Sequence, residues 1–364
     1  MSMHSPVLGN FSSSVRINGS DIGDGKPCFI IAEAGSNHNG DLNTALALVD
    51  VAADAGCDAI KFQTFTGIDI AAGGNSQYTA LPPEFSKWGK NLQELYANCA
   101  LPEEFYAPLS ARAAERGICF MSSPFSEKAV DLLVATGVAA LKIASFELVH
   151  LPLLRHAAAS GLPLVISTGM AGMGDIERAL DAVISGGGKD VVLMHCGSNY
   201  PLGAESAHLS AMKTMQMAFG VPVGYSDHTL GIAVPTAAAA LGAASVEKHF
   251  TLDRSMEGPD HGFAVNPDEL KTMVQYMREA EQAVGLPMKR RQKEEEPHAM
   301  RGRRSIFAAK NLTAGEKLTS DSVKIVRPGV GLEPLLLELL LGRKLVRDVE
   351  EDSPLTWDDF LSSG

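Results

Sequence analysis

The sequence predicts a (β/α)₈ barrel followed by a small, mostly β domain. Between residues 29 and about 285, eight short apolar runs alternate with longer amphipathic segments, which is the rhythm of strands joined by crossover helices. Polar residues gather directly after the apolar runs, where such barrels place their chemistry. After Pro287 the alternation stops, and a charged stretch leads into a short segment of different character.

Taken in order, residues 1–25 are rich in Ser, Gly and Asn and are interpreted as an N-terminal extension. The eight expected strands are residues 29–33, 59–63, 118–122, 140–143, 164–167, 191–195, 221–224 and 245–249. Expected helices include residues 42–55, 103–116, 126–135, 174–185, 206–219 and 231–241. A doubly wound open sheet is the alternative fold, but no GxGxxG motif follows the first strand, which disfavours its dinucleotide-binding form.

Residues 64–98 form a long insert after the second strand, with Gly73-Gly74, Pro82-Pro83 and Trp88. Long loops in compact domains are usually functional lids or disordered, and the aromatic residue favours a lid over the barrel mouth. We place the barrel domain at residues 1–287, a charged linker at 288–302 and the second domain at 303–364. The second domain has only about sixty residues, too few for a large independent core, so we expect it to pack against another part.

The composition is that of an ordinary globular protein of 364 residues, with 45% hydrophobic and 20% charged residues. No apolar run approaches the roughly 20 residues of a membrane span, and residues 1–25 lack the pattern of a signal peptide, so we expect a cytoplasmic protein. A formal charge of −12 opposes nucleic-acid binding. Five cysteines without CxxC spacing indicate reduced thiols rather than disulfides.

Two histidines lie at the ends of consecutive strands in the second half of the barrel. Glu247 and His249 are two residues apart on a strand and therefore face the same side, and His228, just past the preceding strand, can approach them laterally. This geometry suits a metal centre. The competing interpretation is a pair of structural histidines that only make hydrogen bonds.

Lysines and serines end other strands. Two lysines at one barrel mouth repel each other unless an anion lies between them, although each could instead pair with a carboxylate such as Glu33 or Glu247. Residues 167–169 (Ser-Thr-Gly) offer hydroxyl and N–H groups directly before a helix, the usual equipment for binding a phosphate or carboxylate. A pocket for a small polyanion bearing both groups would comprise Lys61, Lys142, Ser145, Ser167 and Ser226.

Several motifs, in order along residues 29 to about 360, resemble those of the sialic acid synthases. They are Ile31-Ala32-Glu33-Ala34-Gly35-Ser36-Asn37-His38-Asn39-Gly40, Lys61-Phe62-Gln63-Thr64, Lys142-Ile143-Ala144-Ser145, Ser167-Thr168-Gly169-Met170, Tyr225-Ser226-Asp227-His228-Thr229, Glu247-Lys248-His249-Phe250 and Gly258-Pro259-Asp260-His261. The C-terminal segment, with Ala314-Gly315 and Arg327-Pro328-Gly329-Val330-Gly331, looks like that family's antifreeze-like (SAF) domain.

The resemblance implies condensation of phosphoenolpyruvate with N-acetylmannosamine or a related N-acetylated hexose, giving a nonulosonic acid and phosphate. It implies a divalent ion, Mn²⁺ or Mg²⁺, held by His228 and His249. Because the C-terminal domain is small, follows a charged linker and carries an Arg327-Pro328-Gly329 turn that resembles the family's sugar-contacting loop, we expect a homodimer in which this domain caps the partner's barrel; the competing interpretation is a solvated surface arginine. Glu33 is the expected proton acceptor or relay. By the same resemblance, phosphoenolpyruvate would be held by Lys61, Lys142, Ser145, Ser167 and Ser226, and the sugar by Glu33, Gln63, Tyr200, Asp260 and Arg327.

Two departures leave the sugar open. Ser198 stands two residues before Tyr200, where some family members have Asn, and residues 261–264 (His-Gly-Phe-Ala) also suit a deoxygenated sugar of legionaminic or pseudaminic acid synthesis. A synthase for a phosphorylated aldose predicts an extra basic cluster at the mouth, which the sequence lacks. An ice-binding or carbohydrate-binding protein with an inactive barrel predicts lost histidine and lysine positions, yet these are present.

Overall fold

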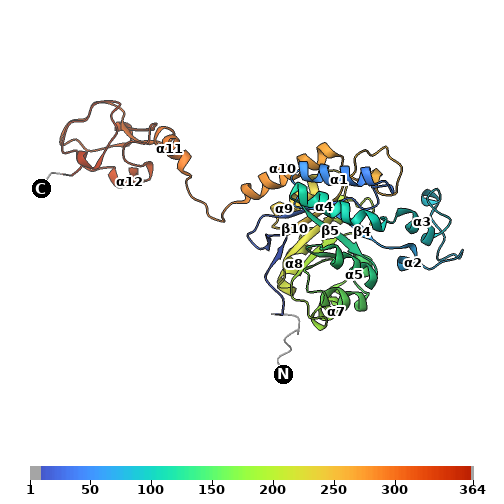
Figure 1. Cartoon of the computed structure of the whole chain (residues 1–364). Coiled ribbons are helices and arrows are strands. Elements are labelled where there is room, and N and C mark those ends of the chain that lie inside the picture. The colour runs from blue at the N-terminus through green and yellow to red at the C-terminus, as the bar shows by residue number, and fades with distance from the viewer. Residues whose placement is uncertain (1–9, 362–364) are drawn as a thin grey trace, which may run out of the picture. The chain divides into compact units, whose positions relative to one another are not determined.

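The computed structural model describes residues 10–361 and contains a closed barrel of parallel strands (Figure 1). The strands follow one another around the barrel in chain order, and β10 pairs with β3 to close it. The predicted barrel is therefore confirmed, and the open doubly wound sheet is excluded. The barrel strands are β3 (Phe29–Glu33), β4 (Ala59–Thr64), β5 (Cys119–Pro124), β6 (Leu141–Ile143), β7 (Leu164–Ser167), β8 (Val191–Cys196), β9 (Val223–Asp227) and β10 (Ser245–His249).

A helix follows each barrel strand and packs on its outer face. Ser126 caps the N-terminus of one of these helices by accepting the amide of Ala129. The predicted helix at 206–219 begins only at Ala211, and the one at 103–116 starts with a 3₁₀ turn, η2 (Glu103–Phe105). The helices are α1 (Leu42–Asp54), α4 (Tyr106–Arg116), α5 (Glu127–Thr136), α6 (Leu151–Ala159), α7 (Met173–Ser185), α8 (Ala211–Phe219), α9 (Ala233–Ala240) and α10 (Pro267–Val284).

The barrel interior changes from apolar to polar along the strands. Side chains alternate between the interior and the helix layer, and the inward positions are apolar at the strand starts. There they form one buried cluster that includes Phe29, Ile31, Ala59, Met121, Val165, Val192 and Met194. At the strand ends the inward positions become charged or hydroxyl-bearing, as in β3, where Ile31 is followed by Glu33. The carboxyl end of the barrel is therefore the polar end, as the sequence predicts.

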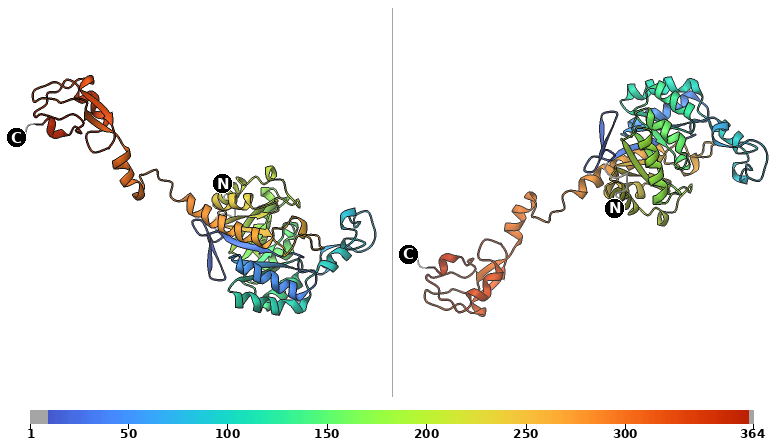
Figure 2. Two further views of the ribbon diagram at one scale, coloured as in Figure 1. Left: turned by 90° about the horizontal axis from the view of Figure 1, so that it is seen from above. Right: turned by 90° about the horizontal axis from the view of Figure 1, so that it is seen from below.

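A β-hairpin precedes the barrel where the sequence analysis expects only an extension. It consists of β1 (Ser14–Ile17) and β2 (Ser20–Gly23), joined at Asn18 and Gly19, which both have positive φ angles. Asn-Gly is a preferred sequence for this tight turn. Val15, Ile17 and Ile22 from the hairpin are buried with the apolar end of the barrel interior. Figure 2 shows the hairpin and the insert on opposite sides of the barrel.

The insert after β4 is ordered and contains α2 (Gly67–Ile70), a 3₁₀ turn η1 (Pro83–Phe85) and α3 (Leu92–Cys99). Its side chains line the cavity at the barrel mouth, so it has the place expected of a lid. Among the described residues, the structure contains no helix long and apolar enough to cross a bilayer.

The C-terminal unit, Leu286–Gly364, is compact by itself. It contains η6 (Lys293–Glu295), α11 (Glu296–Gly302), η7 (Ser320–Ser322), η8 (Pro334–Leu336), α12 (Leu337–Leu340) and η9 (Trp357–Asp359), with β11 (Ser305–Ala308) antiparallel to β12 (Val323–Val326). The unit buries a core of its own, centred on Ile306, Leu318 and Leu355. This small domain agrees with the mostly β character expected from the sequence.

Candidate active site

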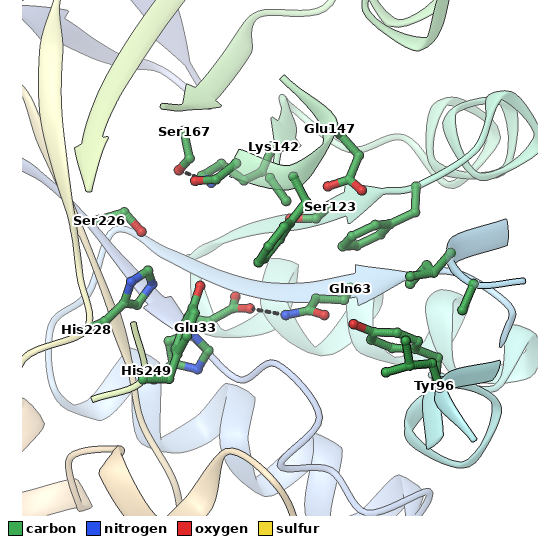
Figure 3. Close-up of a pocket in the computed structure, with 18 of the residues that line it drawn as sticks. Glu33, Gln63, Tyr96, Ser123, Lys142, Glu147, Ser167, Ser226, His228 and His249 are labelled. Carbon is green, nitrogen blue, oxygen red and sulfur yellow. Dashed lines mark hydrogen bonds between the residues drawn. The ribbon is translucent and has the colours of Figure 1, made fainter. Parts of the chain in front are cut away.

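A cavity of about 550 Å³ opens at the polar end of the barrel. Strand ends supply its floor, and the insert supplies part of its wall through residues such as Tyr78, Leu92 and Tyr96. Figure 3 shows Lys142 and Ser167 on one side of this cavity, with His228, His249 and Glu33 across from them. Ten of the predicted site residues line it: Glu33, Lys61, Gln63, Lys142, Ser145, Ser167, Tyr200, Ser226, His228 and His249.

The two predicted lysines share one buried carboxylate. Lys61 Nζ lies 2.7 Å from Glu33 Oε2 and 3.7 Å from Glu247 Oε1, and Lys142 Nζ lies 3.7 Å from Glu247 Oε2. The lysines therefore pair with carboxylates, as the second interpretation from the sequence expects, and they also line the cavity; binding of an anion by them stays a prediction. The lysines lower the pKa of Glu247 to about 2 despite its burial. The two ammonium groups thus face Glu247, which is firmly ionised, and Glu33, so they leave positive charge for an anion when Glu33 is protonated.

Hydroxyl groups surround the lysines. Lys142 Nζ donates to Ser167 Oγ at 2.6 Å, Lys61 Nζ donates to Ser123 Oγ at 3.2 Å, and Ser226 Oγ donates to Glu247 Oε1 at 3.3 Å. On the same wall, Ser145 Oγ accepts the amide of Gly169 at 3.0 Å. This mixture of ammonium and hydroxyl donors is suited to a phosphate and a carboxylate on one small molecule.

Gly169 lets the hydroxyl groups converge. A Cβ atom at this position would lie 2.1 Å from Ser198 Oγ and 2.9 Å from Ser145 Oγ, so any larger residue would fill the space between them. Ser198 Oγ is buried and has no hydrogen-bond partner in the described chain. A buried hydroxyl without a partner calls for a ligand or a water molecule.

Glu33 is a cavity carboxylate whose pKa lies near neutral pH. Its Oε1 accepts a hydrogen bond from Gln63 Nε2 at 2.9 Å (Figure 3), and its carboxylate is 1% exposed. Burial raises the pKa of Glu33 to about 7, with the Lys61 ammonium acting in the opposite direction. A carboxylic acid with this pKa can both release and take up a proton near neutral pH, which is the property that the expected proton relay requires; the role itself stays a prediction.

The histidines meet as predicted. The His228 and His249 rings are 5.7 Å apart, and burial lowers the pKa of both imidazoles, that of His228 to about 4. His228 Nδ1 lies 2.6 Å from the carbonyl of Gly197, so Nδ1 is assigned as the donor and Nε2 keeps its lone pair. His249 Nδ1 is buried and has no partner among the described residues.

These features fit metal ligation, which requires neutral imidazoles with a free nitrogen. Within residues 10–361 no group of three or more His, Cys, Asp and Glu side chains is placed to hold a metal ion. Any divalent ion at His228 and His249 would therefore take its remaining ligands from water or substrate, as at catalytic metal sites with open positions.

The other predicted residues are placed differently. Tyr200 lines the cavity, with its ring 4.1 Å from that of His228. Asp260 does not line the cavity; its Oδ2 accepts from Ser36 Oγ at 2.9 Å and ties the loop after β10 to the loop after β3. Arg327 belongs to the C-terminal unit, where it is exposed and precedes cis-Pro328.

The cavity residues outside the predicted set include Glu247, Ser123 and Glu147. Glu247 enters the sequence analysis as a neighbour of His249 on one strand face and as a possible partner of the lysines, without a role in the site. Ser123 lies at an inward position of β5, two residues after Met121, so strand alternation could have identified it. Burial raises the pKa of Glu147 to about 7; it follows Ser145 in a 3₁₀ turn, η3 (Ser145–Glu147), which the strand pattern does not reveal.

Comparison with known proteins shows the family to which the chain belongs. The sequence model of the NeuB family matches residues 48–289, and that of the SAF domain matches residues 303–361. N,N'-diacetyllegionaminic acid synthase of Legionella pneumophila is 40% identical over 351 residues, covering 95% of this chain and 98% of that protein. N-acetylneuraminate-9-phosphate synthase of Mus musculus is 34% identical, covering 91% and 92%.

Among solved structures, the N-acetylneuraminic acid (sialic acid) synthetase of Leptospira borgpetersenii in complex with citrate superimposes with a TM-score of 0.69. It shares 34% of residues over 79% of this chain and 95% of that chain. With a barrel that matches over most of its length and a SAF domain after it, this chain belongs to the NeuB family of synthases.

Proposed function

We propose that the protein condenses phosphoenolpyruvate with an unphosphorylated acetamido aldose and water, giving a nonulosonic acid and phosphate. The observation that carries the proposal is the division of one cavity into two walls. Lys142 and Ser167 belong to the wall that would bind the anion, and two neutral imidazoles with Glu33 form the wall across from it (Figure 3). Lys61 joins the two walls, because its Nζ lies 2.7 Å from Glu33 Oε2 and 3.7 Å from Glu247 Oε1. This division suits a reaction between a small dianion and a neutral aldehyde.

In the proposed reaction, C3 of the enol attacks the aldehyde carbon, a C–C bond forms, and the aldehyde oxygen gains a proton. Water then adds to the cationic C2 and loses a proton, and the C2–O bond to phosphate breaks as the C2 hydroxyl loses its second proton and becomes the keto group. One of these protons replaces the proton given to the aldehyde oxygen, and the other leaves with the phosphate. Lys61 and Lys142 hold the anion and offset its charge, and Glu33 moves the proton at the aldehyde oxygen. A Mn²⁺ or Mg²⁺ ion held by His228 and His249 would supply Lewis-acid polarisation of that oxygen.

The wall formed by the insert supports an unphosphorylated sugar that carries methyl groups. It presents Ile70, Ala71, Leu92 and Tyr96, beside the carboxylate of Glu147. Among the described residues that line the cavity, Lys61 and Lys142 are the only Lys or Arg side chains, so the barrel itself offers no further cation to a second phosphate. The similarity to a diacetyllegionaminic acid synthase favours a diacetamido-trideoxy aldose over N-acetylmannosamine.

The test is phosphate release from phosphoenolpyruvate with three aldoses, namely N-acetylmannosamine, its 6-phosphate, and a 2,4-diacetamido-2,4,6-trideoxy aldose. We expect turnover that depends on Mn²⁺ or Mg²⁺ and is highest with the diacetamido sugar. Preference for the phosphorylated sugar would overturn the proposed substrate class. Full turnover in excess chelator, with metal analysis confirming a metal-free protein, would overturn the metal site.

We also propose a homodimer in which the SAF domain of each chain caps the barrel mouth of the other. Support comes from exposed apolar side chains on both surfaces: Tyr78 and Phe146 at the mouth, and Leu335 and Trp357 on the SAF domain. Such exposed apolar residues often mark interaction surfaces. Arg327, whose planar donors suit acetamido and hydroxyl oxygens, would then reach the partner's sugar.

Subunit mixing tests this arrangement. Glu33→Gln and Arg327→Ala chains, each inactive alone, are combined under conditions that allow exchange. If the domains are swapped, one barrel of the mixed dimer carries neither change, and up to half of its sites recover activity. If each chain caps itself, every barrel keeps one lesion and the mixture stays inactive. A monomer by light scattering would contradict the proposal directly.

A further inference from the structure

A buried ion pair lies behind the two histidines, on the face of the strands that points away from the cavity. Lys248 Nζ lies 2.6 Å from Asp227 Oδ2, and both side chains are at most 1% exposed. Their Cα atoms are direct partners in the β9–β10 ladder. Strand alternation explains their direction, because their neighbours Ser226 and Glu247 line the cavity.

The same pair holds the turn after β9. The backbone N–H of Thr229 donates to Asp227 Oδ1 and its Oγ1 donates to Asp227 Oδ2, each at 3.1 Å. Lys248 Nζ donates to the carbonyl of Thr229. Three polar groups of Thr229 are thus bound to one ion pair, and His228 stands between Asp227 and Thr229 in the chain.

Other contacts of His228 complete its placement. Its carbonyl accepts the amide of Leu202 at 2.8 Å, and its ring nitrogen Nδ1 bonds to the carbonyl of Gly197. Lys248 is also the residue directly before His249. One ammonium group is therefore connected through the backbone to both imidazoles, although it touches neither ring.

Stability alone does not account for this pair. Removing two charges from water is costly, and apolar residues of similar volume are often at least as stable at such positions. An ion pair with several hydrogen bonds differs from an apolar pair in fixing directions. The residues that orient metal ligands from behind typically change metal affinity by about 10-fold to 100-fold when they are replaced.

We propose that Lys248 and Asp227 are positioning residues whose buried pair fixes the turn bearing His228 against the strand bearing His249, so that both imidazoles can hold one divalent ion. This inference rests on the proposed metal site. It concerns the relative placement of the two rings and assigns neither residue a contact with substrate.

The test uses the full-length protein and measures Mn²⁺ affinity from the electron paramagnetic resonance of free Mn²⁺. Lys248→Met alone leaves Asp227 as an unpaired buried charge. The principal variant is therefore the double replacement of Asp227→Asn and Lys248→Met, which removes both charges of the pair. We expect it to melt cooperatively near the wild-type temperature. Its affinity for Mn²⁺ should fall about 10-fold to 100-fold, while its affinity for phosphoenolpyruvate in chelator stays unchanged.

A second variant, Thr229→Val, keeps the ion pair and loses one hydroxyl contact, so Mn²⁺ affinity should fall roughly two- to tenfold even if the double variant fails to fold. The control is Asp58→Asn with Arg278→Met, which removes a pair at 2.8 Å and should change stability without changing Mn²⁺ affinity.

Wild-type Mn²⁺ affinity in a folded double variant, or in Thr229→Val, would overturn the positioning role. An equal loss of phosphoenolpyruvate affinity would also overturn it, because it would indicate a general distortion of the barrel mouth. If the wild-type protein itself binds no Mn²⁺, the metal site of the proposed function is wrong. If the wild-type protein binds Mn²⁺ and its variants bind it equally tightly, only the positioning role is wrong.

Discussion

Replacing Lys142 by Met tests the anion-binding wall with the least disturbance of the fold. Lys142 is 2% exposed, and its ammonium group contacts Ser167 at 2.6 Å and Glu247 at 3.7 Å. In its absence Glu247 keeps Lys61 at 3.7 Å and the hydroxyl of Ser226, so no carboxylate is left without a partner. Methionine fills most of the volume of the lysine stem.

Lys61 is the less suitable position. It contacts both Glu33 and Glu247, so its removal leaves two buried carboxylates that share no ammonium group. Breaking buried pairs in this way typically costs about 3–5 kcal/mol of stability. A loss of activity in a Lys61 variant would then mix unfolding with lost binding.

For Lys142→Met we expect weaker binding of phosphoenolpyruvate. A charge-assisted contact contributes about 1.5–3 kcal/mol, which corresponds to a roughly 10-fold to 150-fold rise in Kd at about 1.4 kcal/mol per tenfold. Isothermal titration without sugar measures this Kd, and steady-state kinetics should show a smaller change in KM for the sugar. Lys128→Met, at an exposed lysine, is the matched control and should bind normally.

A folded Lys142→Met protein with wild-type affinity for phosphoenolpyruvate would refute the assignment of this wall. Normal phosphoenolpyruvate binding together with a raised KM for the sugar would reverse the two walls. Thermal melting of the variant separates both results from loss of the fold.

Two further predictions concern stability. Burial lowers the pKa of His38 from its ordinary 6.5 to about 4, so stability present above pH 6.5 should be lost as the pH falls toward 4, by up to about 3 kcal/mol. His38→Asn should show a shallower pH dependence of its urea unfolding free energy, and an unchanged slope would contradict the assignment. Ile17 of the hairpin is 0% exposed, so Ile17→Ala should lower the free energy of urea unfolding by about 2–5 kcal/mol. The control is Val134→Ala, at an exposed helix position, which should lower it by under about 0.5 kcal/mol. Similar values for the two variants would show that the hairpin does not seal the barrel.

Strand alternation made most of the barrel predictable. Buried parallel strands read as continuous apolar runs, and the switch to polar inward residues at their ends identified the functional end. The change from apolar to polar residues gave wrong bounds for β9. This strand is expected at 221–224 but runs from Val223 to Asp227. Ser226 and Asp227 looked like the end of a strand, but Ser226 faces the cavity and Asp227 is neutralised by Lys248.

Other misses have different causes. The turn signal Asn18-Gly19 lies in an extension rich in polar residues, and for that reason no β-hairpin is predicted there from the sequence. The contact of Asp260 with Ser36 joins loops more than 200 residues apart, and no local pattern specifies such a pair. Glu147 depends on a 3₁₀ turn after a strand of three residues, Leu141–Ile143, too short to extrapolate from.

The charges in the cavity connect the two walls. Lys61 lowers the pKa of Glu33, while Glu247 and burial raise it to about 7. In the proposed reaction, phosphoenolpyruvate brings negative charge to Lys61 and weakens that stabilisation of the ionised carboxylate. The pKa of Glu33 should therefore rise further when the anion binds, and Glu33 would carry a proton when the aldehyde arrives. This proton can pass to the aldehyde oxygen, which becomes the new hydroxyl group. Binding of phosphoenolpyruvate would therefore favour the protonated form of Glu33 before the aldehyde reacts.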